Sequence, residues 1–517
     1  MVERLATRPE RPWLTLVLLA ALCVSAWQVQ AGLPLNHDVG WLLIGARRLL
    51  EAGRLSAHRF VDVTPPLIVG LYALPVAAAK ALGASEIGAL RIFVIGLAAG
   101  SLRLCQLAAS RLLAGEPSAL LRTWLVAVAV PLLPLVGYDF AQREHLITLL
   151  LLPYLVDAAA RAQAAAPPRS VALWIGAAAG LAIGMKPQFA LVVLAAEALV
   201  WRAQRRLLPG AELGALTAAL ALSAGWTAWA APDYLRVTLP LVWDTYAAYR
   251  APLPELVRWF DPLLAAALIA VAWRLPRGGA LRALARTFGV ASAAAYAAYL
   301  AAGTGWGYHR HPFGVFAIAA LAPALLRPLS RGPITALAVF LVTAASLLVA
   351  PLEIHDVKLE GGQWAGWSQG AASLEILRAA ETRGRGGPVF VFSSSVAPAF
   401  PAVNYAGVEW ASRFSCLWPL PAVIRARAQP EGAVPEARRQ RLEAVARYLV
   451  DAVTDDLERG RPDLVFVPRA PEPQAFGGID FDFLAFFQRD PRFAGLWAGY
   501  APLEDTPSFR IYRLRQP

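Results

Sequence analysis

Acid, base and phenol side chains recur at the ends of apolar stretches along this chain. Asp38 follows directly after an apolar run, and a carboxylate there can take a proton as a general base. Five of the eight residues of the segment 138–145 can ionise or carry a phenol, and Lys186 lies between two short apolar blocks. The segment 303–312 ends in tyrosine, histidine and arginine, which are good partners for a phosphate or a sugar hydroxyl. Acid–base work on a phosphorylated or glycosylated ligand is the chemistry that these residue types favour.

The segment 138–145 borders the bilayer if its flanking apolar blocks span it. Unpaired charge in that position is costly, so its polar residues predict a functional site. Asp139 and Glu144 are both candidates for an acid that lines the site, and the sequence does not choose between them. Arg143 is a further candidate, although an Arg143–Glu144 pair on the surface could also anchor a helix end. Lys186 could likewise extend along apolar surface and place its ammonium in water.

The glycines of the segment 303–312 keep its backbone open near a ligand. Tyr308, His309 and Arg310 are the candidate contacts in this segment. His309 and His311 also suggest a metal site, but two histidines two residues apart lack a fixed third ligand. We therefore expect no cofactor, and a divalent metal stays open as the alternative.

The composition places these segments in a membrane protein. The chain has 517 residues, of which 57% are hydrophobic and 16% are charged, whereas soluble chains are roughly 45–50% apolar and about 25% charged. The apolar residues fall into blocks of about 17–22, the length that crosses a hydrocarbon core of about 30 Å. The net charge of +12 comes from arginines at the block ends, where they orient helices and meet anionic lipids. Membrane lipids are therefore expected partners, and nucleic acid is not.

The positive-inside rule predicts the orientation of the chain. Arginine-rich turns recur between alternate apolar blocks, and the rule puts them in the cytoplasm together with the N-terminus. All these arginine-rich turns fall on the cytoplasmic side only if the block 66–82 lies along the outer face instead of crossing the membrane. This block contains Pro75 and Lys80. The result is about eleven crossings plus juxtamembrane helices in a bacterial inner membrane, with the C-terminus outside. All the polar segments described above then face the extracytoplasmic side.

The tail from residue 352 differs from the rest of the chain. It is less apolar, with strand-like runs at 388–393 and 462–467 and a helical stretch over 435–457. The end, 493–514, has the pattern of two strands joined by a polar turn. The sequence thus predicts a mostly α protein: a transmembrane helical bundle over 1–351 and a small extracytoplasmic (periplasmic) α/β domain over 352–517.

The loop after the first apolar run resembles the first outer loop of the GT-C membrane glycosyltransferases, the superfamily of protein mannosyltransferases and lipid A aminoarabinose transferases. The shared pattern is an acid, an amphipathic helix that ends in Leu-x-x-Gly, a second acid and a Pro-Pro pair. The matching residues here are Asp38, Leu50, Gly53, Asp62, Pro65 and Pro66. Many members have Glu where this chain has Val39, and Lys where it has Thr64.

The resemblance implies a function for these segments. It makes Asp38 the catalytic acid–base residue of a transferase that moves a sugar, with inversion, from a polyprenyl-phosphate donor to an extracytoplasmic glycan, lipid or protein. It also implies that Lys186 faces the donor phosphate. The residues expected to bind substrate or donor phosphate are Asp62, Asp139, Arg143, Glu144, Lys186, Tyr308, His309 and Arg310. A transporter or flippase of lipid-linked sugars and a non-catalytic envelope assembly protein are the alternatives.

The predicted orientation can be tested with reporter fusions. A reporter at Arg205 should be active in the cytoplasm and one at Trp243 outside it, because the arginine rule places these positions on opposite faces. The activity of paired cytoplasmic and periplasmic reporters measures this directly. Finding both positions on one side would contradict the scheme.

Overall fold

In the computed structural model, the described residues are 12–205, 210–257, 279–326, 370–469 and 473–515, with single positions at 263, 266, 267 and 270. The predicted crossing over 334–350, most of the one over 260–273, and the predicted domain boundary after 351 lie outside them. The chain is mostly helical and divides into two compact units. The first unit consists of Met1–Leu33, Arg91–Ala221 and Leu253–His355, and the second of Pro34–Leu90, Leu222–Pro252 and Asp356–Pro517.

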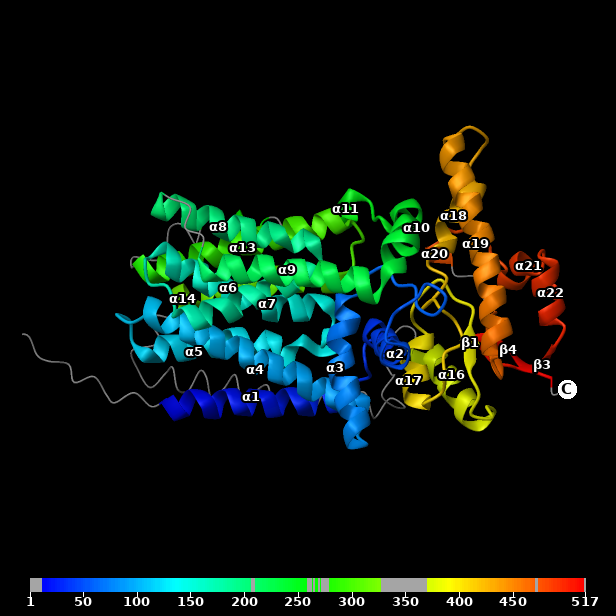
Figure 1. Cartoon of the computed structure of the whole chain (residues 1–517), viewed down its shortest axis with the longest axis horizontal. Helices are drawn as coiled ribbons and strands as arrows, with labels where there is room; N and C mark the ends of the chain where they lie inside the picture. The colour runs from blue at the N-terminus through cyan, green and yellow to red at the C-terminus, as the bar shows by residue number, and fades with distance from the viewer. Residues whose placement is uncertain are drawn as a thin grey trace, which may run out of the picture. The chain divides into compact units, whose positions relative to one another are not determined.

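Helices that lie side by side make up the first unit (Figure 1). They are α1 (Pro12–Gly32), α4 (Glu86–Leu112), α5 (Ser118–Leu132), α6 (Arg143–Ala162), α7 (Arg169–Met185), α8 (Ala190–Gln204), α9 (Ala211–Ala230), α13 (Gly279–Ala302) and α14 (His311–Leu326). Helix α6 packs against α7, α8, α13 and α14, and its residues from Arg143 to Ala160 are all buried. A helix that is apolar on every side is stable only when neighbours surround it, which explains its central place.

Four of the described helices are long and apolar enough to cross a membrane: Thr15–Gly32, Glu86–Leu112, Arg143–Ala162 and Ala211–Ala230. Shorter apolar helices lie at Leu67–Leu82, Ser118–Leu132 and Arg169–Met185. The predicted class, a helical bundle with membrane-crossing helices, agrees with this finding. The number of crossings and their orientation remain predictions, as does the juxtamembrane place of Leu67–Leu82.

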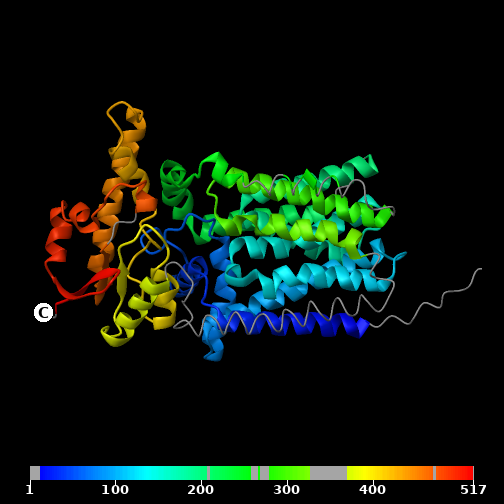
Figure 2. The same ribbon diagram turned by 180° about the vertical axis from the view of Figure 1, so that it is seen from behind.

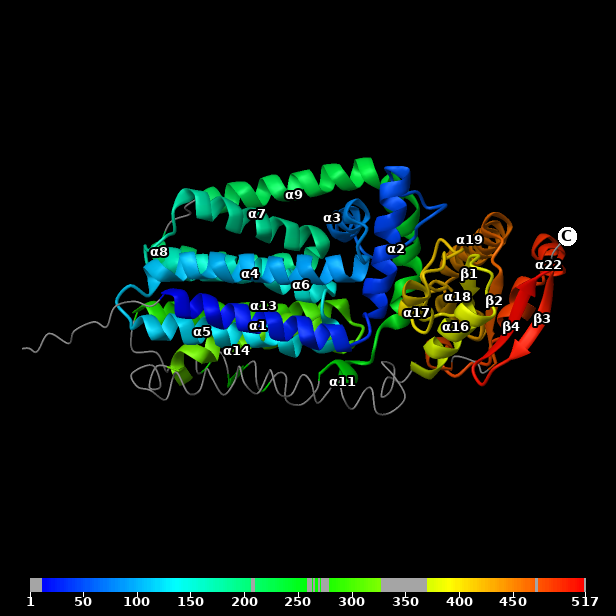
Figure 3. The same cartoon turned by 90° about the horizontal axis from the view of Figure 1, so that it is seen from below.

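The second unit combines helices with one small sheet. Its helical segments are α2 (His37–Ala52), α3 (Leu67–Leu82), η3 (Tyr234–Thr238), α10 (Leu239–Thr245), η4 (Tyr246–Tyr249), α16 (Gly370–Thr382), α17 (Ala399–Ala406), α18 (Leu420–Arg427), α19 (Glu436–Gly460), α20 (Pro473–Phe476), α21 (Phe483–Phe487) and α22 (Pro491–Trp497). The strands β1 (Val389–Val391), β2 (Leu464–Pro468), β4 (Phe509–Leu514) and β3 (Tyr500–Asp505) lie in that order, and Figure 3 labels all four. Figure 2 shows the ribbon from behind. Strands β1 and β2 are parallel and the other pairs antiparallel, so the predicted α/β tail has both predicted strand runs in one sheet.

The last predicted pair of strands begins later than the sequence suggested. Residues Pro491–Trp497 form α22 instead of a strand. Asp490 caps this helix by accepting hydrogen bonds from the backbone N–H groups of Arg492 and Phe493, and Pro491 occupies the first helical position, which it favours. The hairpin of β3 and β4 follows it.

Helix α2 begins one residue before Asp38. Its N-cap is Asn36, whose side-chain Oδ1 accepts a hydrogen bond of 2.9 Å from the backbone N–H of Asp38. Asp38 therefore lies inside the first turn and is not the capping residue. Its negative charge suits a helix N-terminus.

A half-buried arginine ties α2 to the C-terminal part of the second unit. The guanidinium of Arg48 donates hydrogen bonds to the backbone carbonyls of Arg59, of Ser412 at 2.9 Å and of Trp410 at 2.5 Å. Loss of hydration lowers the pKa of Arg48 to about 10, against an opposing attraction from Asp456. A charge partly removed from water is tolerated only when its donors are used, so Arg48 fixes the position of α2.

Replacing Arg48 with lysine should destabilise the protein by about 2 kcal/mol. An ammonium on a flexible stem cannot reproduce the planar fork that spans carbonyls from separate segments. The unfolding temperature of the purified protein in detergent measures the effect. Arg59→Lys is the matched control, because Arg59 is largely exposed and pairs with exposed Glu51, where such a pair contributes about 0–1 kcal/mol. Equal unfolding temperatures for the two variants would contradict the proposed role of Arg48.

Candidate functional site

Three ionisable side chains from separate segments meet in the first unit. The Lys186 ammonium donates a hydrogen bond to Glu144 Oε1. His309 Nε2 lies 3.2 Å from Lys186 Nζ and 3.2 Å from Glu144 Oε1. The side chains of Glu144, Lys186 and His309 are 1%, 11% and 6% exposed, so this cluster is shielded from water.

Breaks in the helices bring these side chains together. Glu144 lies in the first turn of α6. Lys186 follows the end of α7 in an extended conformation, and Pro187 then opens the short helix η2 (Pro187–Phe189) that leads into α8. An interrupted helix leaves backbone and side chains directed at one point, an arrangement found where membrane helices line a cavity.

The third element is the glycine-rich loop before α14. Gly303 and Gly305 have φ values of 70° and 73°, which side chains other than glycine rarely adopt. The loop ends in the short helix η5 (Gly307–Arg310), which carries His309. Thr304 Oγ1 lies 3.1 Å from His309 Nδ1, so both nitrogens of this ring face polar partners.

Aromatic and cationic groups surround the cluster. The Lys186 ammonium lies 5.9 Å from the ring centre of Tyr308, within the range of a cation–π contact. Arg143 donates a hydrogen bond of 3.4 Å to the Tyr308 hydroxyl, and the Trp306 ring stacks on Tyr308 with centres 6.0 Å apart. These contacts bring together two of the sequence-predicted cations, Arg143 and Lys186.

The balance of charge in the cluster determines what it can bind. Arg143, Lys186 and Glu144 are buried or nearly so and together carry one excess positive charge. Buried charges need partners or they destabilise the fold, so an anionic group such as a phosphate suits this cluster.

The alternative in which Arg143 and Glu144 form a surface pair is wrong. Both side chains are buried; Arg143 donates a hydrogen bond to Tyr308, and Glu144 accepts one from Lys186. The alternative in which Lys186 reaches into water is also wrong, because its ammonium contacts Glu144. The last three residues of the segment 138–145 belong to α6. A helical start is what allows Glu144 to enter the bundle.

The histidine that ends the segment 138–145 supports the same helix end. His145 is fully buried, accepts a hydrogen bond of 3.1 Å at Nδ1 from the backbone N–H of Ala141, and lies 2.8 Å at Nε2 from the carbonyl of Leu132. Its proton therefore sits on Nε2, which makes this ring neutral. The packing of η1 (Pro134–Asp139) against α5 creates these partners. No pattern of neighbouring residues in the sequence therefore predicts which groups the His145 ring contacts.

His309 and His311 have different surroundings. His309 faces Lys186 and Glu144, whereas the His311 ring stands edge-on to His145 with centres 5.7 Å apart. Within the described ranges, no group of three or more His, Cys, Asp or Glu side chains is placed to hold a metal ion. The described histidines thus do not form the pair that a shared metal would require.

The remaining predicted residues are placed as follows. Asp139 ends η1 and Arg310 ends η5, and both are half-buried. In the second unit, Asp38 is half-buried beside His37, 3.8 Å from its Nε2. Asp62 accepts hydrogen bonds of 2.8 Å from the Trp41 indole and from the Thr64 backbone. The contacts of Asp62 hold its own loop against α2, and its donor-binding role stays a prediction.

Comparisons with known proteins give a distant structural likeness. No protein-family model matches the chain, and no curated protein matches it. Among solved structures, the chain is similar to the crystal structure of ArnT from Cupriavidus metallidurans bound to undecaprenyl phosphate, with 14% sequence identity and a TM-score of 0.47 over 98% of this chain and 100% of that one. A likeness this distant carries no argument about the site, which rests on the residues above.

Removing one member of the buried ion pair should destabilise the first unit strongly. Glu144→Gln leaves the Lys186 ammonium without its carboxylate, which costs about 3–5 kcal/mol. Adding Lys186→Met should recover most of that loss, because the double variant no longer buries an uncompensated charge. Thermal unfolding of both single variants and the double variant gives the coupling energy.

The matched control for this cycle is Glu255→Gln, which removes an exposed carboxylate from the same unit. It should leave the unfolding temperature nearly unchanged. Additive effects of Glu144→Gln and Lys186→Met would show that the two side chains do not interact.

Proposed function

We propose that this chain is an integral membrane glycosyltransferase that moves a sugar from a polyprenyl-phosphate donor to an extracytoplasmic acceptor. The observation that carries the proposal is the buried cluster of Lys186, Glu144 and His309 where the ends of apolar helices meet. A cluster with excess positive charge, next to helices able to cross a membrane, suits a phosphate attached to a lipid. The resemblance of the loop around Asp38 to GT-C transferases supplies the reaction type.

Lys186 and Arg143 would hold the donor phosphate in this proposal. As the bond from the anomeric carbon to the phosphate oxygen breaks, negative charge grows on that oxygen, and preorganised cations shielded from water stabilise it best. Glu144 keeps the ammonium of Lys186 in place before the donor arrives. Tyr308 and His309 can donate hydrogen bonds to the phosphate or to the sugar hydroxyls, and Arg310 ends the same short helix.

Asp38 would act on the acceptor. As general base it takes the proton from an acceptor hydroxyl, whose oxygen attacks the anomeric carbon while the lipid phosphate leaves from the opposite face. Attack from behind inverts the configuration at that carbon. Asp62 and Asp139 complete the proposed substrate contacts, and the acceptor is a glycan, lipid or protein of the cell envelope.

Asp38→Asn should abolish transfer while the protein still folds. The amide keeps the shape of the carboxylate but cannot take the proton, and losing a general base typically lowers a rate by about 10²–10⁴-fold. Release of polyprenyl phosphate from a polyprenyl-phosphate sugar by the purified protein measures the reaction. Glu51→Gln is the matched control, because Glu51 is an exposed acid on the same helix α2.

The same assay separates the enzyme from its rivals. A flippase moves the lipid-linked sugar without releasing polyprenyl phosphate, and an assembly protein does neither. Wild-type release by the Asp38→Asn variant would remove Asp38 from the mechanism.

Lys186→Met, paired with Glu144→Gln to preserve folding, should weaken donor binding and so raise the KM for the donor.

A further inference from the structure

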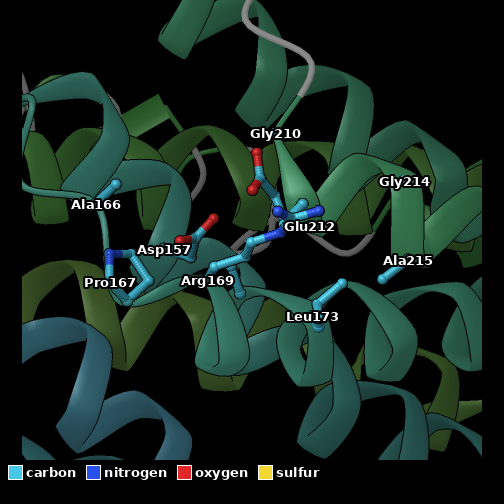
Figure 4. A pocket seen from close by; sticks show the side chains of 11 residues that line it. Asp157, Ala166, Pro167, Arg169, Leu173, Gly210, Glu212, Gly214 and Ala215 are labelled. Atoms are coloured by element: carbon cyan, nitrogen blue, oxygen red, sulfur yellow. The ribbon is translucent and has the colours of Figure 1, made fainter.

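A second charged site lies at the opposite end of α6 from the cluster of Glu144. A pocket of about 550 Å³ is lined by residues of α6, α7 and α9 and the turns next to them. Figure 4 shows Arg169 and the carboxyl groups of Asp157 and Glu212 gathered on its wall. Asp157 lies thirteen residues beyond Glu144 on the same helix, which corresponds to roughly 20 Å along the axis. The two sites are therefore separate.

The guanidinium of Arg161 forms ion pairs with three carboxylates at this end of the bundle. Arg161 Nε lies 2.7 Å from Asp157 Oδ2, its Nη2 lies 2.5 Å from Glu197 Oε1, and its Nη1 lies 3.3 Å from Glu212 Oε1. The side chains of Asp157 and Glu212 are 0% and 4% exposed. Even when Arg169 in the pocket wall is added, these five side chains carry one excess negative charge. An excess charge that deep is unfavourable unless a further cation reaches it.

The carboxylate oxygens of these acids lie at the pocket. In the part of the chain that the structure describes, Asp157 Oδ1 is buried and has no hydrogen-bond partner, and buried Glu212 Oε1 makes no hydrogen bond beyond its 3.3 Å ion pair with Arg161. Both residues line the pocket. Buried acceptors are nearly always satisfied in folded proteins, so unsatisfied ones beside a cavity indicate a donor that enters it.

Glycines make room for this arrangement. A side-chain carbon on Gly210 would lie 2.2 Å from Glu212 Oε1, and one on Gly176 would lie 1.9 Å from the backbone carbonyl oxygen of Glu212. Any larger residue at these positions would displace the carboxylate or separate α7 from α9. The backbone is therefore built to hold Glu212 at this place.

We propose that this pocket binds a primary ammonium group, which supplies one positive charge and three N–H donors. The charge matches the single excess negative charge of the cluster, and the donors suit Asp157 Oδ1, which makes no hydrogen bond in the described residues, and the neighbouring Glu212 carboxylate. The remainder of the wall is small and apolar, with residues such as Ala172, Leu173 and Ala215, and it suits the carbon attached to an amine.

The ammonium can come from a phospholipid with an ethanolamine headgroup or from a soluble amine. Leu173 in the pocket wall is 44% exposed, and only 22% of the apolar window of α9 is buried, so the pocket borders a surface that lipid can cover. Asp157 lies about 7 Å from the C-terminal end of α6, a depth that a headgroup can reach. This inference does not depend on the proposed transferase reaction.

Native mass spectrometry of the full chain in detergent tests the proposal with three added lipids: phosphatidylethanolamine, phosphatidylcholine and phosphatidylglycerol. We expect the protein to retain the ethanolamine lipid about tenfold more than the other two lipids. Charge-assisted hydrogen bonds from its N–H groups are lost in phosphatidylcholine, whose nitrogen is trimethylated, and in phosphatidylglycerol, whose headgroup has no ammonium. A second arm adds free ethanolamine. Displacement of the lipid places the site at a headgroup, and ethanolamine binding without any lipid preference identifies a soluble amine as the source.

Two variants and one control locate the binding. Glu212→Gln should remove the preference by neutralising the carboxylate, and Ala215→Leu should remove it by filling the pocket without changing any charge. Ala218→Leu is the control, because it adds the same bulk to an exposed position of α9. The same preference in wild type, Glu212→Gln and Ala215→Leu would overturn the proposal, and so would the absence of any response to ethanolamine lipid and to ethanolamine.

Discussion

The ion pair between Lys186 and Glu144 constrains the rest of the first unit. Two charges held away from water stabilise a fold only when each faces the other and their remaining polar atoms have partners. That requirement explains why α7 is interrupted at Lys186, why the loop before α14 needs glycines, and why α6 begins at Arg143. Each break in regular structure places one member of the cluster, so the irregular segments are the ones that carry the chemistry.

Helix α6 separates two regions of opposite charge. Its first turn carries Glu144 within a cluster that has an excess of positive charge, and its last turns carry Asp157 within a cluster that has an excess of negative charge. Between the two clusters lie the buried and mostly apolar residues 146–156. Their low polarity does little to weaken the electric field of either cluster. A helix enclosed by four neighbours is rigid enough to hold both clusters at a fixed separation, which is the condition for preorganised binding sites.

The C-terminal part of the second unit acts on α2. Arg48 of α2 bonds to the carbonyls of Trp410 and Ser412, and Asn404 donates a hydrogen bond of 3.0 Å to the carbonyl of Gly40. Asp456 in turn accepts hydrogen bonds from Arg413 and Arg459. The helix that carries Asp38 is thus held by polar contacts from the tail, which gives this domain a positioning role whatever else it binds.

The sequence alone determined the helical, membrane-type character of the chain, the α/β tail and the polar segments worth attention, because apolar block length, strand pattern and isolated charge are local properties. It also selected Lys186, Glu144 and His309 individually. It could not choose between Asp139 and Glu144, exclude a surface role for Arg143, give the partners of His145, or find the carboxylates around Arg161. Those outcomes depend on which side chains meet across helices far apart in the chain, and burial and partners follow from packing in three dimensions. Only the tertiary structure therefore turned candidate residues into a charged cluster.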